Sequence, residues 1–372
     1  MAKRRGSGEG TIFKRADGRW VAMLTVGHDE NGCRRRRALY GATRKEVADK
    51  LAALQHDAKT GPLPEPERMT VGEFLDRWLS DVARTRVRET TYYTYRSFIR
   101  THLKPRIGGV PLQRLTPPHF QQMLGAMERD GCGPRLRQAV HATLRRALAD
   151  AVRWRLLSYN PCALVDRPRV PRREMRALGP VEARMLLDAA RGNRLEALIV
   201  LALGTGARQG ELMGLRWGDF DADAARLVIQ RQVVDVNGKP AISEPKTAAG
   251  RRSIDLANFC VEALLRHREA QSASPHPTAW IFADEKGGPL RRQNFRRRVW
   301  EPLARAAGVP GLRFHDLRHS CASLLAARGV HPRVVQSILG HADVQTTLQV
   351  YSHVTEALGR EAATKLDAML GA

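Results

Sequence analysis

Residues 314–353 read FHDLRHSCASLLAARGVHPRVVQSILGHADVQTTLQVYSH. Within this stretch His315 and Arg318 stand three positions apart, residues 339–341 are Leu-Gly-His, and Tyr351 follows further on. Side chains at i and i+3 share one face of a helix, so His315 and Arg318 are predicted to point the same way. A guanidinium can bind two phosphate oxygens, imidazoles can move protons, and a phenol can act as a nucleophile. The stretch therefore carries the groups that phosphate chemistry requires.

Three upstream boxes extend this pattern. Residues 205–212 read TGARQGEL, residues 214–217 read GLRW and residues 245–247 read PKT. Followed by H-x-x-R, L-G-H and Y-S-H, they resemble the active-site boxes of the tyrosine recombinases, the family of phage integrases and chromosome-dimer resolvases. Their joint presence, in the order of the family, makes the resemblance specific.

The resemblance implies that Tyr351 is the nucleophile. It would attack the scissile phosphorus and leave a 3′-phosphotyrosyl link with a free 5′-hydroxyl. A free phenol has a pKa of ~10, so a base or nearby positive charge must activate it. Arg208 and Arg318 would each present a guanidinium fork to nonbridging oxygens and stabilise the charge on the phosphorane. Glu211, one turn after Arg208, is the expected partner that orients Arg208.

Lys246, His315 and His341 complete the set that the resemblance implies. Lys246 is expected near the tip of a hairpin, where it would protonate the leaving 5′-oxygen, and Lys239 is the nearby alternative. His315 would accept or relay the tyrosine proton, and His341 would hydrogen-bond the phosphate. The histidines expected to be structural are His319 and His353.

The sequence predicts neither a metal site nor a cofactor. Its five cysteines are scattered and no C-x-x-C occurs, which favours reduced thiols over disulfides or a zinc site. Asp219, Asp221 and Asp223 resemble the start of a calcium loop, but Ala224 and Gln230 stand where the loop needs Gly and Glu. No Walker A phosphate loop is present. The two guanidiniums and the lysine are expected to neutralise the phosphate instead.

The chain is strongly basic. Its 372 residues include 62 Lys and Arg against 38 Asp and Glu, which gives a net charge of +24. Such a charge favours a polyanionic partner, most often nucleic acid, over the alternative of general solubility. No apolar run approaches the ~18 residues of a membrane span, and the N-terminus lacks the apolar core of a secretory signal. We therefore expect a cytoplasmic, nucleoid-associated protein with no membrane partner.

A chain of this length predicts two or three domains. Residues 1–62 are predicted to form a small sheet plus one helix, because residues 20–26 alternate like a half-buried strand and Thr43-x-x-Glu46 is a capping box. With arginines at 34–37, this unit resembles the arm-site DNA-binding domain of phage integrases, whose sheet can enter a major groove. A solvated edge strand protected by charge is the alternative for these arginines.

Two larger domains are predicted to follow. Residues 68–166 should form an all-helical bundle of four helices that resembles the core-binding domain of the family, with Phe74, Trp78 and Val82 in one core stripe. Residues 167–176 read as an extended linker. Residues 175–372 should form a mainly helical catalytic domain with a small antiparallel sheet, beginning with one helix over residues 181–203. The candidate phosphate contacts on the bundle are Arg86, Arg88, Arg96, Arg100, Arg135, Arg137, Arg145 and Arg146.

We therefore predict a site-specific DNA recombinase, the integrase of a phage or other mobile element, working without ATP or metal. The resemblance implies double-stranded DNA with core and arm attachment sites, a tetramer on DNA, and DNA-bending and directionality factors as candidate partners. It also implies exchange of the amphipathic tail at 355–370 between subunits, although that periodicity fits docking on its own domain equally well. The alternatives are a resolution or excision enzyme, a type IB topoisomerase, and a DNA-binding regulator on an inactive recombinase fold.

Overall fold

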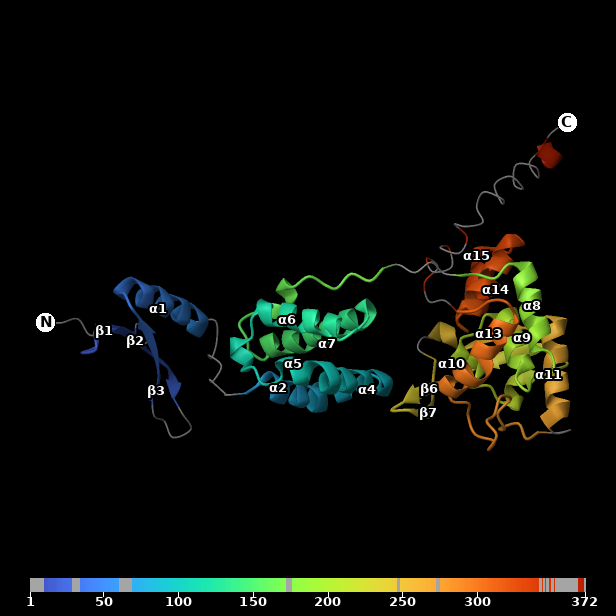
Figure 1. Ribbon diagram of the computed structural model, residues 1–372, viewed down its shortest axis with the longest axis horizontal. Coiled ribbons are helices and arrows are strands. Elements are labelled where there is room, and N and C mark those ends of the chain that lie inside the picture. Colours follow the sequence, from blue (N-terminus) through green and yellow to red (C-terminus); the bar gives the residue numbers. More distant parts are fainter. Residues whose placement is uncertain are drawn as a thin grey trace. The chain divides into compact units, whose positions relative to one another are not determined.

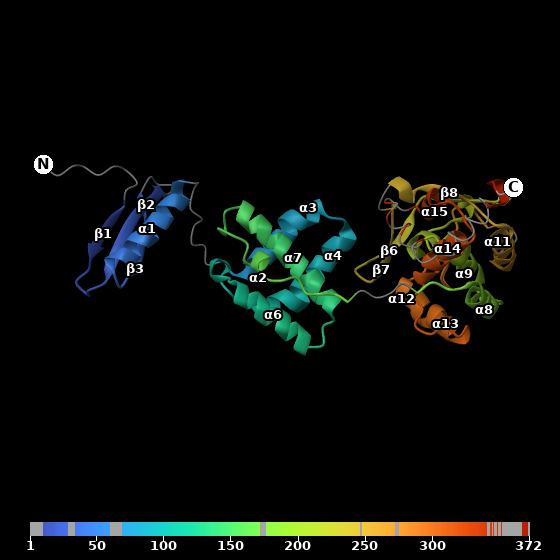
Figure 2. The ribbon, with the colours of Figure 1, turned by 90° about the horizontal axis from the view of Figure 1, so that it is seen from above.

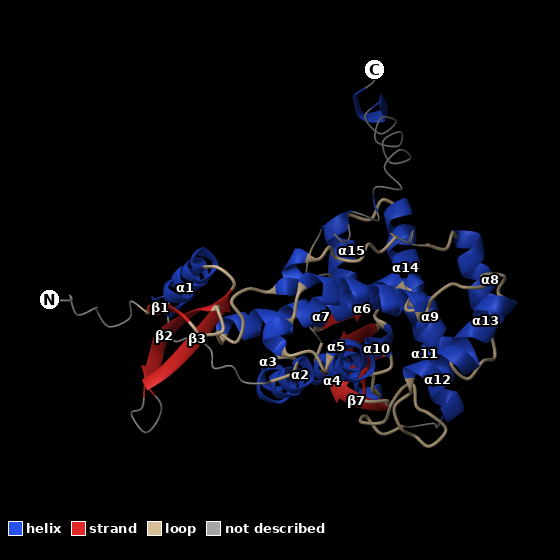
Figure 3. Ribbon diagram, turned by 60° about the vertical axis from the view of Figure 1, so that its left-hand side comes forward, coloured by secondary structure: helices blue, strands red, loops and turns tan. Residues whose placement is uncertain are grey.

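The computed structural model describes residues 10–28, 34–59, 69–171, 176–245, 248–271 and 275–340, with residues 343, 345, 348, 351 and 367–370 near the C-terminus. Contacts divide the chain into two compact units, residues 1–171 and 172–372. Helices dominate the described residues, and the strands form small antiparallel sheets (Figures 1 and 3). Of the helices that are described, none is both long enough and apolar enough to cross a membrane.

Residues 10–59 form a three-stranded sheet with one helix packed against it (Figure 2). Ala22 and Leu24, which alternate on the middle strand, are buried with Val47 and Leu51 of the helix in a small core of their own. Half of the predicted capping box is present, since the Glu46 backbone N–H donates to Thr43 Oγ1 at 3.2 Å, whereas the Glu46 carboxylate accepts from the Ala42 N–H at 2.9 Å. The elements are β1 (Thr11–Lys14), β2 (Trp20–His28), β3 (Arg34–Gly41) and α1 (Arg44–Lys59).

The rest of the first unit is a bundle of four helical stretches, two of which contain a π-helical turn. The first is α2 (Val71–Trp78), the turn Leu79–Ala83 and α3 (Arg84–Arg86); the second is α4 (Glu89–Phe98), the turn Ile99–Leu103 and α5 (Lys104–Ile107). The others are α6 (Pro117–Arg129) and α7 (Pro134–Arg153). Phe74, Trp78 and Val82 are all buried, so the stripe expected from their spacing faces the core.

A buried carboxylate connects the first and last stretches of this bundle. Asp150 of α7, 3% exposed, accepts a 2.7 Å hydrogen bond from Trp78 Nε1. It also pairs with Arg86 and Arg153, whose side chains remain more than half exposed. Asp150 Oδ1 pairs with a guanidinium nitrogen of each arginine, so this one carboxylate positions two cations at the surface of the bundle.

The second unit is built round α9 (Glu196–Thr205), whose residues 197–203 are all buried. A helix that is apolar on every side must be covered on every side, and α9 packs against α8 (Pro180–Ala190), α11 (Asn258–Gln271) and α14 (Asp316–Ala327). The remaining helices are α10 (Gln209–Leu212), α12 (Arg292–Phe295), the π-helical turn Arg296–Trp300, α13 (Glu301–Ala306) and α15 (Pro332–Leu339). The central α9 thereby places its own C-terminus beside α14.

The prediction of one helix over residues 181–203 was wrong, because α8 ends at Ala190 and α9 begins at Glu196. Gly192 breaks the helix with a left-handed φ of +72°. Asn193 then accepts from the Leu195 N–H at 2.9 Å through its side-chain oxygen, forming an Asx turn ahead of α9. Glycine and asparagine are thus turn residues here, although the apolar spacing runs on through them.

The strands of the second unit form two small sheets where one was expected. One sheet has the order β4-β5-β8 and the other is the hairpin β6-β7. The hairpin turns at Asn237 and Gly238, both with positive φ, so its tip lies next to Lys239 and away from residue 246 in the sequence. The strands are β4 (Phe220–Asp221), β5 (Arg226–Ile229), β6 (Gln232–Val236), β7 (Lys239–Ser243) and β8 (Arg252–Asp255).

Candidate active site

The turn between α9 and α10 presents Arg208. Gly206 caps α9 in the left-handed conformation, at φ +59° and ψ +18°. A Cβ at Gly206 would come within 2.3 Å of Leu339 Cδ2 at the end of α15, so the close approach of these segments also requires glycine. Arg208 follows in an extended conformation at the start of α10, and its side chain is 37% exposed. The arginine therefore projects from a rigid turn with part of its guanidinium open to solvent.

Arg318 lies beneath this turn in the first part of α14. The residue is 3% exposed, and its Nη1 donates to the Gly206 carbonyl at 2.9 Å. Its buried Nη2 has no hydrogen-bond partner among the described residues. Burial, followed by the charge of Arg208, lowers the pKa of Arg318 to about 9. A buried guanidinium nitrogen without an acceptor is costly, and an anion at this position would remove that cost.

Glu211 is the partner that the sequence predicted for Arg208. Arg208 Nη1 donates to Glu211 Oε1 at 2.7 Å, and the Arg208 backbone N–H donates to Oε2 at 3.0 Å. A second guanidinium, Arg252 at the start of β8, donates to Oε2 at 3.0 Å. Burial by itself raises the pKa of Glu211, but the pair with Arg252 and the bonds from both arginines hold it below its usual range. Glu211 is therefore ionised and engaged on both oxygens.

His315 caps α14 beside the arginines. The residue is exposed, but desolvation of its ring, followed by the charges of His319 and Arg318, lowers its pKa to about 4. The rings of His315 and His319 meet edge to face with centroids 5.3 Å apart. The His315 ring is consequently neutral at pH 7, and an anion bound beside it would raise its pKa and make it a stronger proton acceptor. The structure thus brings together three of the predicted residues, Arg208, Arg318 and His315.

Tyr351 contacts the loop that follows α14 and the small core between α14 and α15. Its hydroxyl donates to the carbonyl of Val330, and its ring packs on the small core formed by Ala322, Val335 and Leu339. Arg318 and the end of α14 are about 14 Å apart along the helix axis at 1.5 Å per residue. Burial raises the pKa of Tyr351. In this arrangement the phenol is hydrogen-bonded to Val330.

The two remaining predicted residues, Lys246 and His341, lie outside the described residues. The residue that precedes each of them is described. Gly340, the residue before His341, caps α15 at φ +67° and accepts a 3.2 Å hydrogen bond from Arg208 Nη2. Pro245, which precedes Lys246, is buried and contacts Gly250.

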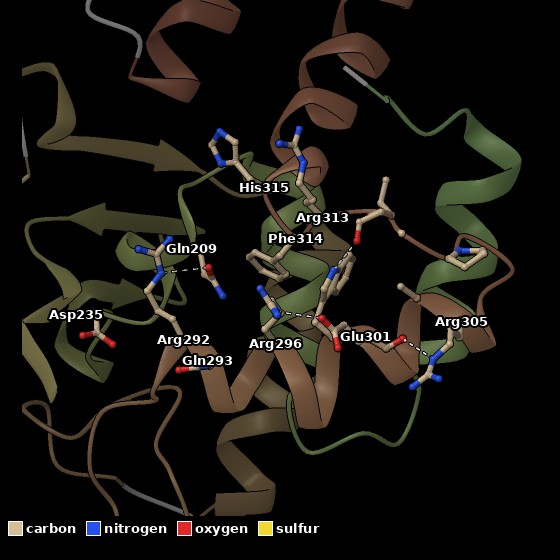
Figure 4. Close-up of a pocket in the computed structure, with 15 residues that line it drawn as sticks. Gln209, Asp235, Arg292, Gln293, Arg296, Glu301, Arg305, Arg313, Phe314 and His315 are labelled. Carbon is tan, nitrogen blue, oxygen red and sulfur yellow. Dashed lines mark hydrogen bonds and ion pairs between the residues drawn. The ribbon is translucent and has the colours of Figure 1, made fainter. Parts of the chain in front are cut away.

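A basic hollow of about 880 Å³ opens next to His315 (Figure 4). Arg292 projects into it from α12 with its Nε 3.3 Å from Gln209 Oε1, and Arg296 pairs with Glu301 across 3.0 Å. Arg313 lies on its rim, where its Nη2 donates to Asp316 Oδ1 at 2.7 Å and its Nε to Oδ2 at 3.2 Å, and Asp316 is buried. The hollow thus places arginines of α12, α13 and the segments next to them around the space beside His315.

Comparison with known proteins identifies the family. The model of the phage integrase family matches residues 176–357, and that of the N-terminal SAM-like domain of phage integrases matches residues 70–127. An integrase of Streptomyces ambofaciens is 30% identical over 366 residues, which cover 94% of each protein. The chain belongs to the tyrosine recombinase family of integrases. The XerC-like tyrosine recombinase of Caldanaerobacter subterraneus is 28% identical over 357 residues, 89% of this chain and 91% of that protein.

Solved structures of integrases share the fold. The Tn1549 transposon integrase, in complex with a circular intermediate DNA, superposes with a TM-score of 0.68 over 80% of this chain and 99% of its own. A lambda integrase tetramer bound to a Holliday junction covers 94% of this chain and 96% of its own with a TM-score of 0.59. Because these structures are only 22% and 20% identical in sequence to this integrase, they show that the fold is shared and nothing further.

Sequence reasoning missed Arg252 and the two backbone carbonyls. The sequence placed Arg252 only as the first residue of a strand. Its side chain is 7% exposed and pairs with Glu211, which nothing in the local sequence pattern indicates. The carbonyls of Gly206 and Gly340 bind Arg318 and Arg208, respectively. A glycine before a box residue could have signalled a left-handed cap, but its acceptor role depends on the tertiary structure.

We predict that the His315 pKa in this integrase lies well below 6.5 in the free protein. Neighbouring cations disfavour the imidazolium, so Arg318→Gln should raise the pKa, and a bound phosphate should raise it as well. An NMR titration of the ring carbons in free, Arg318→Gln and DNA-bound protein measures all three values. A free-protein pKa at or above 6.5 that neither change moves would contradict this electrostatic description.

Proposed function

We propose that this integrase cleaves and rejoins DNA at specific sites through a 3′-phosphotyrosyl intermediate. The observation that carries the proposal is the buried Nη2 of Arg318, which has no acceptor among the described residues and lies beside Arg208 and His315. A phosphodiester supplies the missing acceptor and the missing negative charge at once. Planar guanidiniums match the geometry of two phosphate oxygens.

In the proposed step Tyr351 Oη bonds to phosphorus and the bond from phosphorus to the 5′-oxygen breaks. The phenolic proton passes to His315, which is neutral at pH 7, and Lys246 gives a proton to the leaving oxygen. Arg208, Arg318 and His341 hydrogen-bond the nonbridging oxygens while charge develops there. The phosphodiester is exchanged for a phosphotyrosine ester, so no nucleotide has to be consumed, and attack by a 5′-hydroxyl reverses the step.

Tyr351 has to change partners for this step. Its hydroxyl is bound to Val330 beyond the C-terminal end of α14, whereas Arg318 lies in the first turns of that helix. The proposed attack therefore requires the segment that carries Tyr351 to leave Val330 and approach the arginine cluster. Binding of DNA, which brings the phosphate to Arg318, is the event to which we assign this movement.

We further propose three domains: an arm-type DNA-binding domain over residues 1–62, a core-binding domain over residues 68–166 and the catalytic domain over residues 175–372. The separate cores of residues 10–59 and of the helical bundle support the first boundary. The match of the SAM-like model to residues 70–127 supports the second domain. The lambda integrase tetramer on a Holliday junction supports assembly of this chain as a tetramer on DNA.

The experiment that tests the proposed chemistry is a covalent-trapping assay. The protein is mixed with a duplex attachment site that is nicked next to the scissile phosphate, so that a short fragment diffuses away and religation stops. We expect a protein–DNA adduct on a denaturing gel with wild type and none with Tyr351→Phe, because phenylalanine has no nucleophilic oxygen. Tyr159→Phe, at an exposed tyrosine of the first unit, is the matched control. Specific DNA binding with no adduct would instead indicate a DNA-binding regulator.

The arm assignment predicts that residues 1–62 and the catalytic step can be separated. Deleting these residues should weaken binding to accessory arm sites and leave cleavage of an isolated core site unchanged. A gel-shift assay on arm DNA and the trapping assay on core DNA measure the two effects. Because phosphate contacts release counterions, arm binding by the full chain should fall steeply as salt rises. Equal arm-site affinity with and without residues 1–62 would overturn the assignment.

A further inference from the structure

Arg252 is almost fully buried and uses all three nitrogens of its guanidinium. Nε donates to the Ile338 carbonyl at 2.7 Å, Nη1 to the Gly250 carbonyl at 3.2 Å, and Nη2 to Glu211 Oε2 at 3.0 Å. The side chain is 7% exposed and that of Glu211 is 2% exposed. A planar guanidinium places donors on three separate nitrogens and can reach three acceptors that are too far apart for the single nitrogen of a lysine.

Each of these acceptors belongs to a segment that carries a predicted active-site residue. Glu211 holds Arg208 through Oε1. Gly250 ends the short helical turn Ala248–Gly250, which follows Lys246 and Thr247 in the chain. Ile338 lies in the last turn of α15, three residues before His341. A single buried side chain thus links the segments that lead to Arg208, Lys246 and His341.

A second contact closes these links into a ring. Arg208 Nη2 donates to the Gly340 carbonyl at 3.2 Å, so the end of α15 is held by Arg208 on one side and by Arg252 on the other. A Cβ at Gly340 would lie 2.6 Å from the Ala249 carbonyl and 2.9 Å from Arg252 Nη1. The end of α15 and the turn Ala248–Gly250 therefore pack with their backbones in close contact, which a side chain at Gly340 would prevent.

Arg252 also controls how Arg208 uses Glu211. A carboxylate and a guanidinium prefer to pair through two parallel hydrogen bonds. Oε2 accepts from Arg252 Nη2 and from the Arg208 backbone N–H, so the Arg208 side chain pairs with Glu211 through Nη1 alone. Without Arg252, Oε2 would keep only the backbone N–H, and Glu211 would draw the Arg208 guanidinium toward itself and away from an incoming phosphate.

We propose that Arg252 is a positioning residue that holds Arg208 and the segments leading to Lys246 and His341 in the relative placement that strand cleavage needs. This inference rests on the proposed function. Arg252 contacts no substrate in this account, and it acts only through Glu211 and the backbone of the two neighbouring segments. A misplacement of about 1 Å at reacting groups can cost about 10²-fold in rate, so the loss of Arg252 should lower the cleavage rate far more than DNA affinity.

The experiment compares full-length wild type, Arg252→Ala, Arg252→Lys and Arg226→Ala. Arg226 of β5 is the matched control. It pairs across 3.2 Å with Asp255, which lies on β8 as Arg252 does, but its side chain is 53% exposed and outside the ring. Gel shift gives the affinity for the core duplex, and the nicked attachment site at saturating protein gives the single-turnover rate of adduct formation. Circular dichroism identifies the temperature range in which each variant is folded.

For Arg252→Ala we expect an affinity close to wild type and adduct formation about 10²-fold slower. Arg252→Lys keeps the charge but reaches fewer acceptors, so it should recover only part of the rate, and Arg226→Ala should cleave like wild type. Should the alanine variant not fold, the lysine variant provides the same comparison. Rates of Arg252→Ala within about threefold of wild type, a loss explained by affinity, an equal loss in Arg226→Ala, or unfolding of both Arg252 variants would overturn the proposal.

These outcomes are distinct from a failure of the proposed function. If wild type binds its duplex and never forms an adduct, the phosphotyrosyl chemistry itself is wrong. If wild type forms the adduct and Arg252→Ala matches it, the chemistry stands and only the role of Arg252 is overturned.

Discussion

Several guanidiniums lie close to one buried carboxylate, Glu211, in the second unit of this integrase, and the surrounding packing fixes their positions. Arg208 and Arg252 pair with Glu211, while Arg318 lies close enough for their charges to lower its pKa. Positive charge that is buried in excess of negative charge destabilises a fold. The all-apolar helix α9 and the left-handed glycine caps at 206 and 340 supply the rigid packing that tolerates it. The same excess of charge makes the site ready for a phosphate.

The reactive groups of this site do not all lie at the cluster. Arg208, Arg318 and His315 are together, whereas the Tyr351 hydroxyl is bound to Val330 at the far end of α14. In the proposed mechanism, the groups that bind the phosphate are therefore preorganised in a stable core, whereas the nucleophile has a separate contact in the free protein. The proposal accordingly assigns the change in Tyr351 contacts to DNA binding and leaves the arginine cluster in place.

Local pattern predicted much of this protein, because its elements agree with their propensities. The stripe at Phe74, Trp78 and Val82 is found where the sequence placed it. The pairing of Arg208 with Glu211 follows from their spacing of three on the first turn of a helix. The break between α8 and α9 was missed because apolar spacing continues through Gly192 and Asn193, whose turn chemistry prevails.

The ring around Arg252 could not be predicted in the same way. Two of its three acceptors lie far from it in the chain, 41 residues away at Glu211 and 86 at Ile338, and only Gly250 is a near neighbour. No periodicity links such positions, and an arginine at the start of a strand is usually solvated. The order of the boxes predicted which residues would lie close together. The hydrogen bonds that hold them there depend on how α9, α14 and α15 pack, which the sequence pattern does not give.

The central claim is that two guanidinium forks bind the scissile phosphate, and Arg208→Lys tests it most directly. Lysine keeps the positive charge but cannot form two parallel bonds to phosphate oxygens. With the core duplex saturating, the account predicts unchanged DNA affinity and single-turnover cleavage slower by about 10²–10³-fold. Cleavage by Arg208→Lys at the wild-type rate would contradict it.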